Sequence, residues 1–158
     1  MNWITALVSL GSSLLVGIGT ALITTRLALR RFHSEKWWER KTAAYAAIIE
    51  SMHHIREHAD TLGEVELRDR KLAPERKELL DRNLREAIGD LRKHRDIGSF
   101  VISEQAINVL DGLFGELEKA AAHLDQGSLF EYFDERAAAL DRALKKMRQV
   151  AKSDLSLS

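Results

Sequence analysis

Residues 104–125, EQAINVLDGLFGELEKAAAHLD, contain the pattern that decides the fold. Their apolar residues recur at alternating spacings of four and three, which places them on one face of an α-helix that packs against other helices. This face consists of Ala106, Leu110, Leu113, Leu117, Ala120 and Leu124. Ser103 is a suitable N-cap before this helix, and Gly127 lies just after its end.

Three further segments have the same kind of apolar face. Residues 129–152, preceded by the capping box of Ser128 and Glu131, present Phe133, Ala137, Leu140, Leu144, Met147 and Ala151. Residues 74–95, which begin with Pro74, present Leu80, Leu84, Ala87 and Leu91. Upstream, two series with a seven-residue period consist of Trp38, Tyr45, Met52 and Ala59, and of Ile48, Ile55 and Leu62.

The connectors between these segments set the expected topology. Thr61-Leu62-Gly63 interrupts the first pattern, and residues 64–73 are expected to form a charged connector, with or without a short helix. The other connectors are short, and short connections between helices of matched length favour antiparallel neighbours. The sequence therefore predicts an all-α fold, an antiparallel up-down four-helix bundle over residues 42–152, followed by a frayed tail over residues 153–158.

A long uncharged segment precedes the bundle. Residues 3–25 are 23 consecutive residues without a charge, and about 20 apolar residues are needed to cross a bilayer. A cleavable signal peptide is the main alternative, but such a peptide needs basic residues before its apolar core, and only Met1 and Asn2 precede Trp3. We therefore expect residues 1–25 to form a transmembrane helix that continues into the bundle, since no Pro or Gly lies between Thr20 and Leu62.

Charge is unevenly distributed along the chain. The totals cancel, with 24 Lys plus Arg and 24 Asp plus Glu, but residues 26–41 carry six basic and two acidic side chains. Basic residues after a span place the following domain in the cytoplasm and the N-terminus outside. Residues 26–41 are thus predicted to be a basic, aromatic juxtamembrane stalk. Its expected membrane-interface residues are Arg26, Arg30, Arg31 and Trp37.

The remaining 117 residues have an excess of four acidic side chains, which argues against a nucleic-acid-binding protein. The chain has no Cys, so disulfides and thiolate metal sites are excluded.

Trp37 allows a second interpretation, in which it packs at the edge of the bundle while Trp38 opens the core.

Small residues recur at every fourth position of the predicted span, from Thr5 to Thr25. Such a row lets two helix backbones approach closely within a membrane. The predicted packing face consists of Ser9, Ser13, Gly17 and Ala21, and it indicates a homo-oligomer or a partner membrane protein.

The motif closest to known chemistry is His54-Ile55-Arg56-Glu57-His58, which matches the H-x-x-E-H pattern of inverted zinc peptidases. Two histidines four residues apart lie on one helix face and can bind one metal ion. Catalysis also needs a third ligand and a cleft, and the helical phase places His54 and His58 on a flank that suits solvent. We expect no catalytic residue and no cofactor. A metal-binding protein or metal-dependent hydrolase using His54 and His58 is the alternative.

Lys36-Trp37-Trp38-Glu39-Arg40-Lys41, the following Ala44-Tyr45 and the stretch Ala151–Leu155 carry a resemblance. The chain resembles small uncharacterised bacterial single-pass membrane proteins, which have one N-terminal span, a basic-aromatic junction and a helical cytoplasmic region. The resemblance implies no activity.

Together these patterns predict a membrane-anchored helical bundle that acts as a scaffold, tether or regulatory subunit without catalysis. Its expected location is the bacterial inner membrane, with a single span, and its expected partners are the lipid bilayer and either a second copy or a partner membrane protein. A component of a bacterial stress or phage-defence membrane complex is a further alternative.

Overall fold

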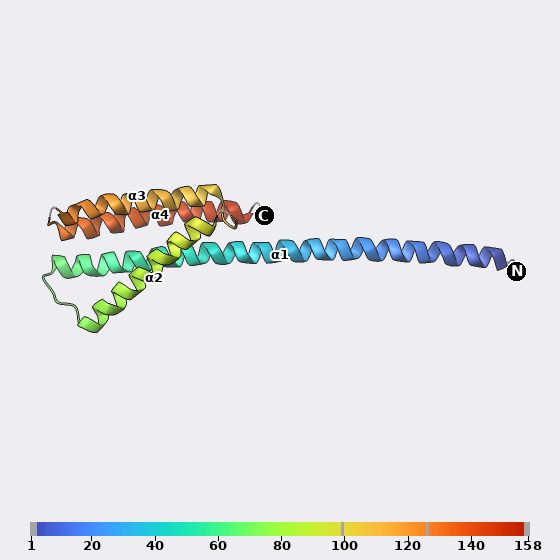
Figure 1. Cartoon of the computed structure of the whole chain (residues 1–158), viewed down its shortest axis with the longest axis horizontal. Coiled ribbons are helices and arrows are strands. Elements are labelled where there is room, and N and C mark those ends of the chain that lie inside the picture. Colours follow the sequence, from blue (N-terminus) through green and yellow to red (C-terminus); the bar gives the residue numbers. More distant parts are fainter. Residues whose placement is uncertain (1–2, 99, 126, 157–158) are drawn as a thin grey trace. The chain divides into compact units, whose positions relative to one another are not determined.

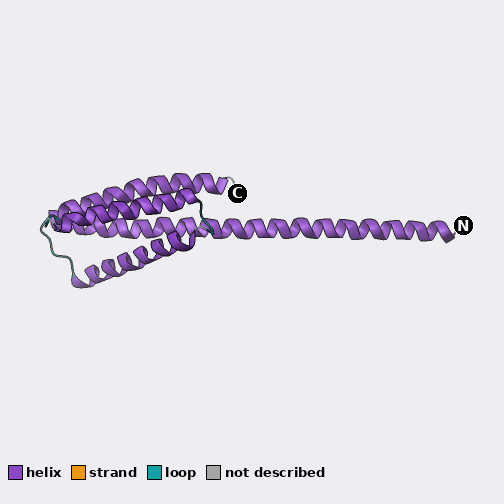
Figure 2. Ribbon diagram, turned by 45° about the horizontal axis from the view of Figure 1, so that its top comes forward, coloured by secondary structure: helices purple, strands orange, loops and turns teal. Residues whose placement is uncertain are grey.

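The computed structural model describes the backbone of residues 3–98, 100–125 and 127–156, and side chains from residue 24 onward within these ranges. In these ranges the protein is all-helical, with four helices and no strand (Figures 1 and 2). The helices are α1 (Trp3–Leu67), α2 (Pro74–Gly98), α3 (Glu104–Asp125) and α4 (Leu129–Ser156). The chain divides into two compact units, Met1–Glu39 and Arg40–Ser158, and each is described by itself.

In the first unit, side chains are described only from Thr24 onward. Within the described part of the chain, the structure contains no helix with the length and apolar character that a membrane crossing requires. Of the predicted span, residues 3–25, the structure describes the side chains of only the last two residues. The predicted packing face of Ser9, Ser13, Gly17 and Ala21 lies outside the described side chains entirely.

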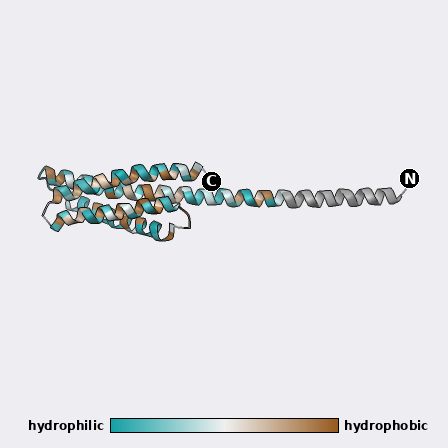
Figure 3. Cartoon of the chain, turned by 90° about the horizontal axis from the view of Figure 1, so that it is seen from above, coloured by the Kyte–Doolittle hydropathy of each residue, from teal (hydrophilic) through white to brown (hydrophobic). Residues whose placement is uncertain are grey.

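The second unit is consistent with the predicted helical bundle. Successive helices run in alternating directions, and α3 lies beside α4 (Figures 1 and 2). Each helix of this unit carries both hydrophobic and hydrophilic residues (Figure 3). All four helices contribute side chains to one core, whose largest fully buried members are Tyr45, Ile48, Met52, Ile55, Leu91, Leu110, Leu113, Leu140 and Met147. The apolar faces predicted for the four helices are thus largely confirmed.

The end of α1 differs from the prediction. The helix continues through Gly63 to Leu67, four residues beyond the expected break. A Cβ atom added at Gly63 would lie 3.2 Å from the Cβ atom of Phe133 in α4, so this glycine allows two helices to approach closely. A glycine within an apolar pattern can therefore mark a tight helix contact as well as a helix end.

Backbone hydrogen bonds close two of the helices in the same way. Asp69 (φ 45°) follows α1, and the amide of Arg70 donates to the carbonyl of Val65 at 3.0 Å. Gly127 (φ 74°) follows α3, and the amide of Ser128 donates to the carbonyl of His123 at 3.0 Å. Both ends have the Schellman arrangement, in which a residue of left-handed conformation lets carbonyls of the last turn find partners.

Two predictions about the ends of the apolar faces are wrong. Helix α4 includes Ser153 to Ser156, which the sequence indicated to be frayed, because Asp154 is held by contacts with α1 and with the residue before α3. Trp38 does not open the core, since it is 44% exposed and full burial along α1 begins at Tyr45. A seven-residue repeat shows which face is apolar but not where the helices that cover it begin.

Candidate functional site

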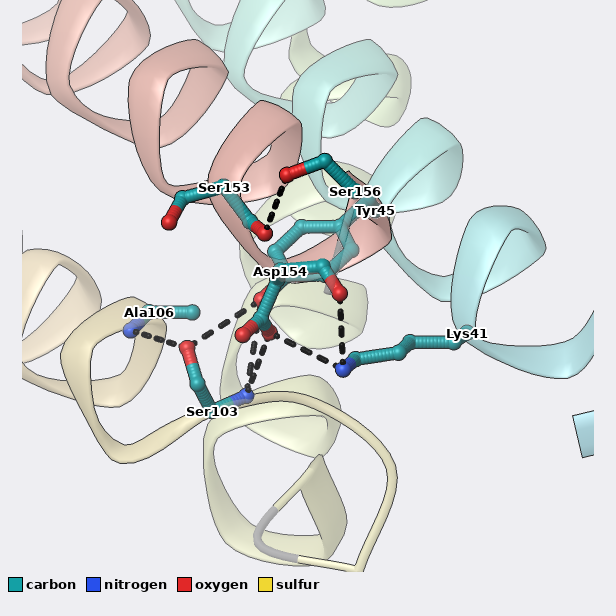
Figure 4. A network of polar contacts seen from close by, with 7 residues as sticks. All are labelled: Lys41, Tyr45, Ser103, Ala106, Ser153, Asp154 and Ser156. Carbon is teal, nitrogen blue, oxygen red and sulfur yellow. Dashed lines mark hydrogen bonds and ion pairs between the residues drawn. The ribbon is translucent and has the colours of Figure 1, made fainter. Parts of the chain in front are cut away.

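A cluster of four polar side chains connects three parts of the second unit (Figure 4). It consists of Lys41 and Tyr45 from α1, Ser103 from the loop before α3, and Asp154 from α4. The Tyr45 hydroxyl donates a hydrogen bond to Oδ2 of Asp154 and lies 3.3 Å from Oγ of Ser103. The backbone amide of Ser103 donates to the same Oδ2 at 3.2 Å. This set is called the Tyr45–Asp154 cluster below.

Lys41 and the N-cap of α3 complete the arrangement. The Lys41 Nζ atom lies 3.5 Å from Oδ2 of Asp154 and donates to the backbone carbonyl of Asp154 at 3.3 Å. Ser103 Oγ accepts a hydrogen bond from the amide of Ala106 at 3.4 Å, as expected of an N-cap. One carboxylate thus receives hydrogen bonds from two separate elements and lies beside a cation from α1.

The charge states of this cluster follow from its environment. Burial, and then the hydrogen bond to Asp154, raise the pKa of Tyr45 above its usual value of 10.0. Burial by itself raises the pKa of Asp154, but hydrogen bonds from Tyr45 and Ser103 and the charge of Lys41 outweigh it and lower the pKa overall. At neutral pH the phenol is therefore a neutral donor and the carboxylate a charged acceptor.

These charge states favour a structural role for the cluster. A general acid or base works best with a pKa near the operating pH. In the Tyr45–Asp154 cluster the two pKa values move away from neutrality in opposite directions. The cluster is thus suited to fixing α1, α4 and the start of α3 to one another, and it is poorly suited to proton transfer.

The two histidines of the H-x-x-E-H motif have different surroundings. The His54 Nδ1 atom lies 3.9 Å from a carboxylate oxygen of Glu57, and the side chain is 44% exposed. His58 is only 5% exposed, contrary to the expected solvent-facing flank, and its Nε2 atom lies 3.2 Å from Oδ1 of Asp81 in α2. Burial lowers the pKa of His58, Asp81 opposes this, and the charge of Arg136 adds to it.

Within the described residues, no group of three metal-ligating side chains is present. His54 and His58 each have a nearby carboxylate, but from different helices. Metal binding by this pair stays a prediction.

The predicted membrane-interface residues belong to the first unit and are all exposed. They are Arg26, Arg30, Arg31 and Trp37. The Arg31 Nε atom forms an ion pair of 2.9 Å with Glu35 one turn later. Such an exposed pair contributes little to stability, so the basic side chains remain available for contacts with anionic groups.

The role of Asp154 is not among the sequence-based predictions, although the sequence contains a signal for it. Asp154 follows Met147 and Ala151 at spacings of four and three, so it continues the apolar face of α4. Ser103 stands in the same relation to Ala106 and Leu110 at the start of α3. A polar residue in a core phase indicates a buried hydrogen bond, so the pattern predicts such bonds at Asp154 and Ser103 without identifying their partners.

Comparisons with models of known protein families, with curated proteins and with solved structures give no match to this chain.

Proposed function

We propose that this protein is a membrane-anchored helical bundle that acts as a scaffold, tether or regulatory subunit without catalysis. Its location is the inner membrane of a bacterium, with the N-terminus outside and residues 42–158 in the cytoplasm. The observation that carries the proposal is the order along the chain of an uncharged segment of 23 residues, six basic residues among the next 16, and an acidic helical domain.

The exposure of the basic segment supports the anchor. Every residue from Thr24 to Arg40 is exposed, including Leu27, Leu29, Phe32, Trp37 and Trp38. Large apolar and basic side chains that alternate on an exposed helix suit the interface of a membrane with anionic lipids. The acidic excess of residues 42–158 suits a domain that an anionic surface does not attract.

The interior of the second unit supports a non-catalytic role. Its core is filled by apolar side chains from all four helices. The hydroxyl of buried Tyr45 is held by hydrogen bonds to Ser103 and Asp154 within the domain. A rigid bundle of this kind presents helix surfaces to partners.

Topology can be tested by single-cysteine labelling because the natural chain has no Cys. In intact cells, a membrane-impermeant maleimide should label the Asn2→Cys variant and leave Lys119→Cys unlabelled, and both should react after permeabilisation. Recovery of the full-length chain in the soluble fraction, or labelling of Lys119→Cys in intact cells, would contradict the proposal.

Assembly through the small-residue face has a matched pair of variants. Gly17 lies on the predicted face, whereas Gly19 lies about 200° round the helix from it. Gly17→Leu should reduce the mass of the detergent-solubilised complex, and Gly19→Leu should leave that mass unchanged. A wild-type chain that is already monomeric, or equal effects of the two variants, would show that this face does not mediate assembly.

The scaffold role is tested by affinity purification of the full-length chain from membranes. We expect a second copy or a membrane protein to co-purify in fixed stoichiometry. Recovery of the chain as a lone monomer, or turnover of a substrate by the purified protein, would contradict a non-catalytic scaffold.

A further inference from the structure

A cavity of about 480 Å³ lies between α2, α3 and α4 in the second unit. Its lining contains three arginines, Arg92 and Arg95 from α2 and Arg136 from α4, and one carboxylate, that of Glu118. This volume is within the range of small-molecule sites, about 300–1,000 Å³. The cavity therefore combines ligand-sized space with a lining that has more arginines than carboxylates.

Arg136 is the most informative residue of this cavity, because its side chain is buried and has no counter-ion among the described residues. The residue is 6% exposed, and it forms no ion pair with any residue in the described ranges. Its Nη1 atom donates to the hydroxyl of Tyr132 at 2.5 Å, and its buried Nε atom has no hydrogen-bond partner. A buried cation without a compensating anion is costly, so an anionic ligand in this cavity would supply what the protein lacks.

The α2 arginines extend the positive charge to the mouth of the cavity. Arg92 is exposed and forms no ion pair with another described residue. Arg95, three residues later, shares its charge with Asp96 at 3.1 Å and Asp111 at 3.8 Å. Residues three apart are neighbours on a helix surface, so both guanidinium groups approach the cavity from the same side. Glu118 forms no ion pair with either of them in the described part of the chain.

The rest of the lining is aromatic and apolar. Phe114 lies under the Arg95 guanidinium, whose Cζ atom is 5.3 Å from the ring centroid. The centroid of the Tyr132 ring lies 5.6 Å from Cζ of Arg136. Both rings line the cavity, so a ligand there meets aromatic surface beside the guanidinium groups. Guanidinium groups bind phosphate through paired hydrogen bonds.

We propose that the cavity lined by Arg92, Arg95 and Arg136 binds a small organic phosphate with a planar ring, the chemical class of a nucleoside monophosphate. The phosphate lies against the guanidinium groups, and the ring packs against Phe114 and Tyr132. A bare phosphate ion satisfies the charge but leaves most of the cavity and its aromatic walls unused. This inference is independent of the membrane anchor and of the scaffold role.

The test is calorimetric titration of the purified full-length chain with each of the four ribonucleoside monophosphates. Two further compounds each contain one part of the proposed ligand. Adenosine has the ring without the phosphate, and glycerol 3-phosphate has the phosphate of a lipid headgroup without the ring. We expect one site per chain for at least one monophosphate. We expect binding at least ten-fold weaker for glycerol 3-phosphate, and for adenosine when it is compared with its own monophosphate.

Variants locate the site. Arg136→Gln and Arg92→Gln should each weaken binding ten-fold or more, and Arg136→Lys should also weaken it because lysine lacks the planar pair of donors. Arg76→Gln is the matched control, since Arg76 is exposed on the same helix as Arg92 and does not line the cavity. Far-UV circular dichroism melting verifies that each variant is folded.

Several outcomes would overturn the proposal. They are the absence of binding by all four monophosphates at millimolar concentration, equal losses in Arg76→Gln and Arg92→Gln, and unchanged binding in Arg136→Gln. Glycerol 3-phosphate binding as tightly as the monophosphates would also overturn it, and would indicate a lipid-headgroup or simple phosphate site.

Discussion

The replacement Tyr45→Phe tests the role assigned to the Tyr45–Asp154 cluster. Tyr45 is 2% exposed, so phenylalanine keeps the ring packing and removes only the hydroxyl. The lost hydrogen bond has a charged acceptor, which makes it worth about 2 kcal/mol. Asp154 keeps its hydrogen bond from the Ser103 amide and its contact with Lys41, so no buried charge is left unpaired. At about 4 °C per kcal/mol, the melting temperature should fall by about 8 °C.

The effect of Tyr45→Phe on stability should also depend on pH, in a direction set by the pKa shifts of Asp154 and Tyr45. The pKa of Asp154 is lowered in the folded state, so its contribution to stability is complete above the usual pKa of 3.8 and is lost as the pH falls further. The difference between wild type and Tyr45→Phe should therefore shrink from pH 7 to pH 3. The raised pKa of Tyr45 means that the wild type also loses stability as the pH rises above 10, a loss that Tyr45→Phe should not show.

The assay is chemical and thermal denaturation of the full-length chain, monitored by far-UV circular dichroism at pH 3, 7 and 10.5; the first gives the free energy of unfolding and the second the melting temperature. Asp90→Asn is a control, because Asp90 is an exposed carboxylate in the middle of α2, and its effect should stay within about 0.5 kcal/mol. A Tyr45→Phe effect below about 0.5 kcal/mol at pH 7, or one that is the same at pH 3, would refute the reasoning.

Three further predictions use the same denaturation assay. Gly63→Ala should destabilise the protein by about 1 kcal/mol because the added Cβ atom meets α4 at 3.2 Å. Gly89→Ala, whose added Cβ atom has nothing within 4 Å, should stabilise it by about 0.5–1 kcal/mol. Equal effects of the two variants would contradict the close contact at Gly63. The pKa of His58 is lowered by burial, against the influence of Asp81, so stability should fall as the pH drops below the usual value of 6.5. His58→Gln should flatten that slope, and a slope that is unchanged would place its origin elsewhere. Leu140→Ala removes a side chain that is 0% exposed and should cost about 2–5 kcal/mol, so a loss below 1 kcal/mol would show that the core is not packed as described.

The sequence predicts the helices of the second unit well because their burial is one-sided. A face such as Leu110, Leu113 and Leu117 repeats with the period of the helix itself, and the residues that bound it, Ser103 and Gly127, have backbone preferences of their own. Helix number, three of the four start positions and most of the core follow from such local signals.

Contacts between helices are less visible in the sequence. A glycine at position 63 is compatible both with the end of a helix and with a close approach of α4. Only the position of Phe133 in the structure distinguishes these two roles. Asp154 and Tyr45 are 109 residues apart, so nothing local indicates that they meet. Arg136 lies in a helix with many charged residues, and only the packing of its neighbours shows that this guanidinium is buried and forms no ion pair with a described residue.

The sequence separation in the Tyr45–Asp154 cluster also has a consequence for biosynthesis. A ribosome adds about 5–20 residues per second, so the 109 residues between the two partners take about 5–20 s to make. During that interval the apolar face of α1, with Tyr45, Ile48 and Met52, has no α4 to cover it. The hydrogen bond from Tyr45 to Asp154 therefore forms only after α4 has been synthesised. We expect the new chain to depend on α2, or on a chaperone, for protection of this face until α4 arrives.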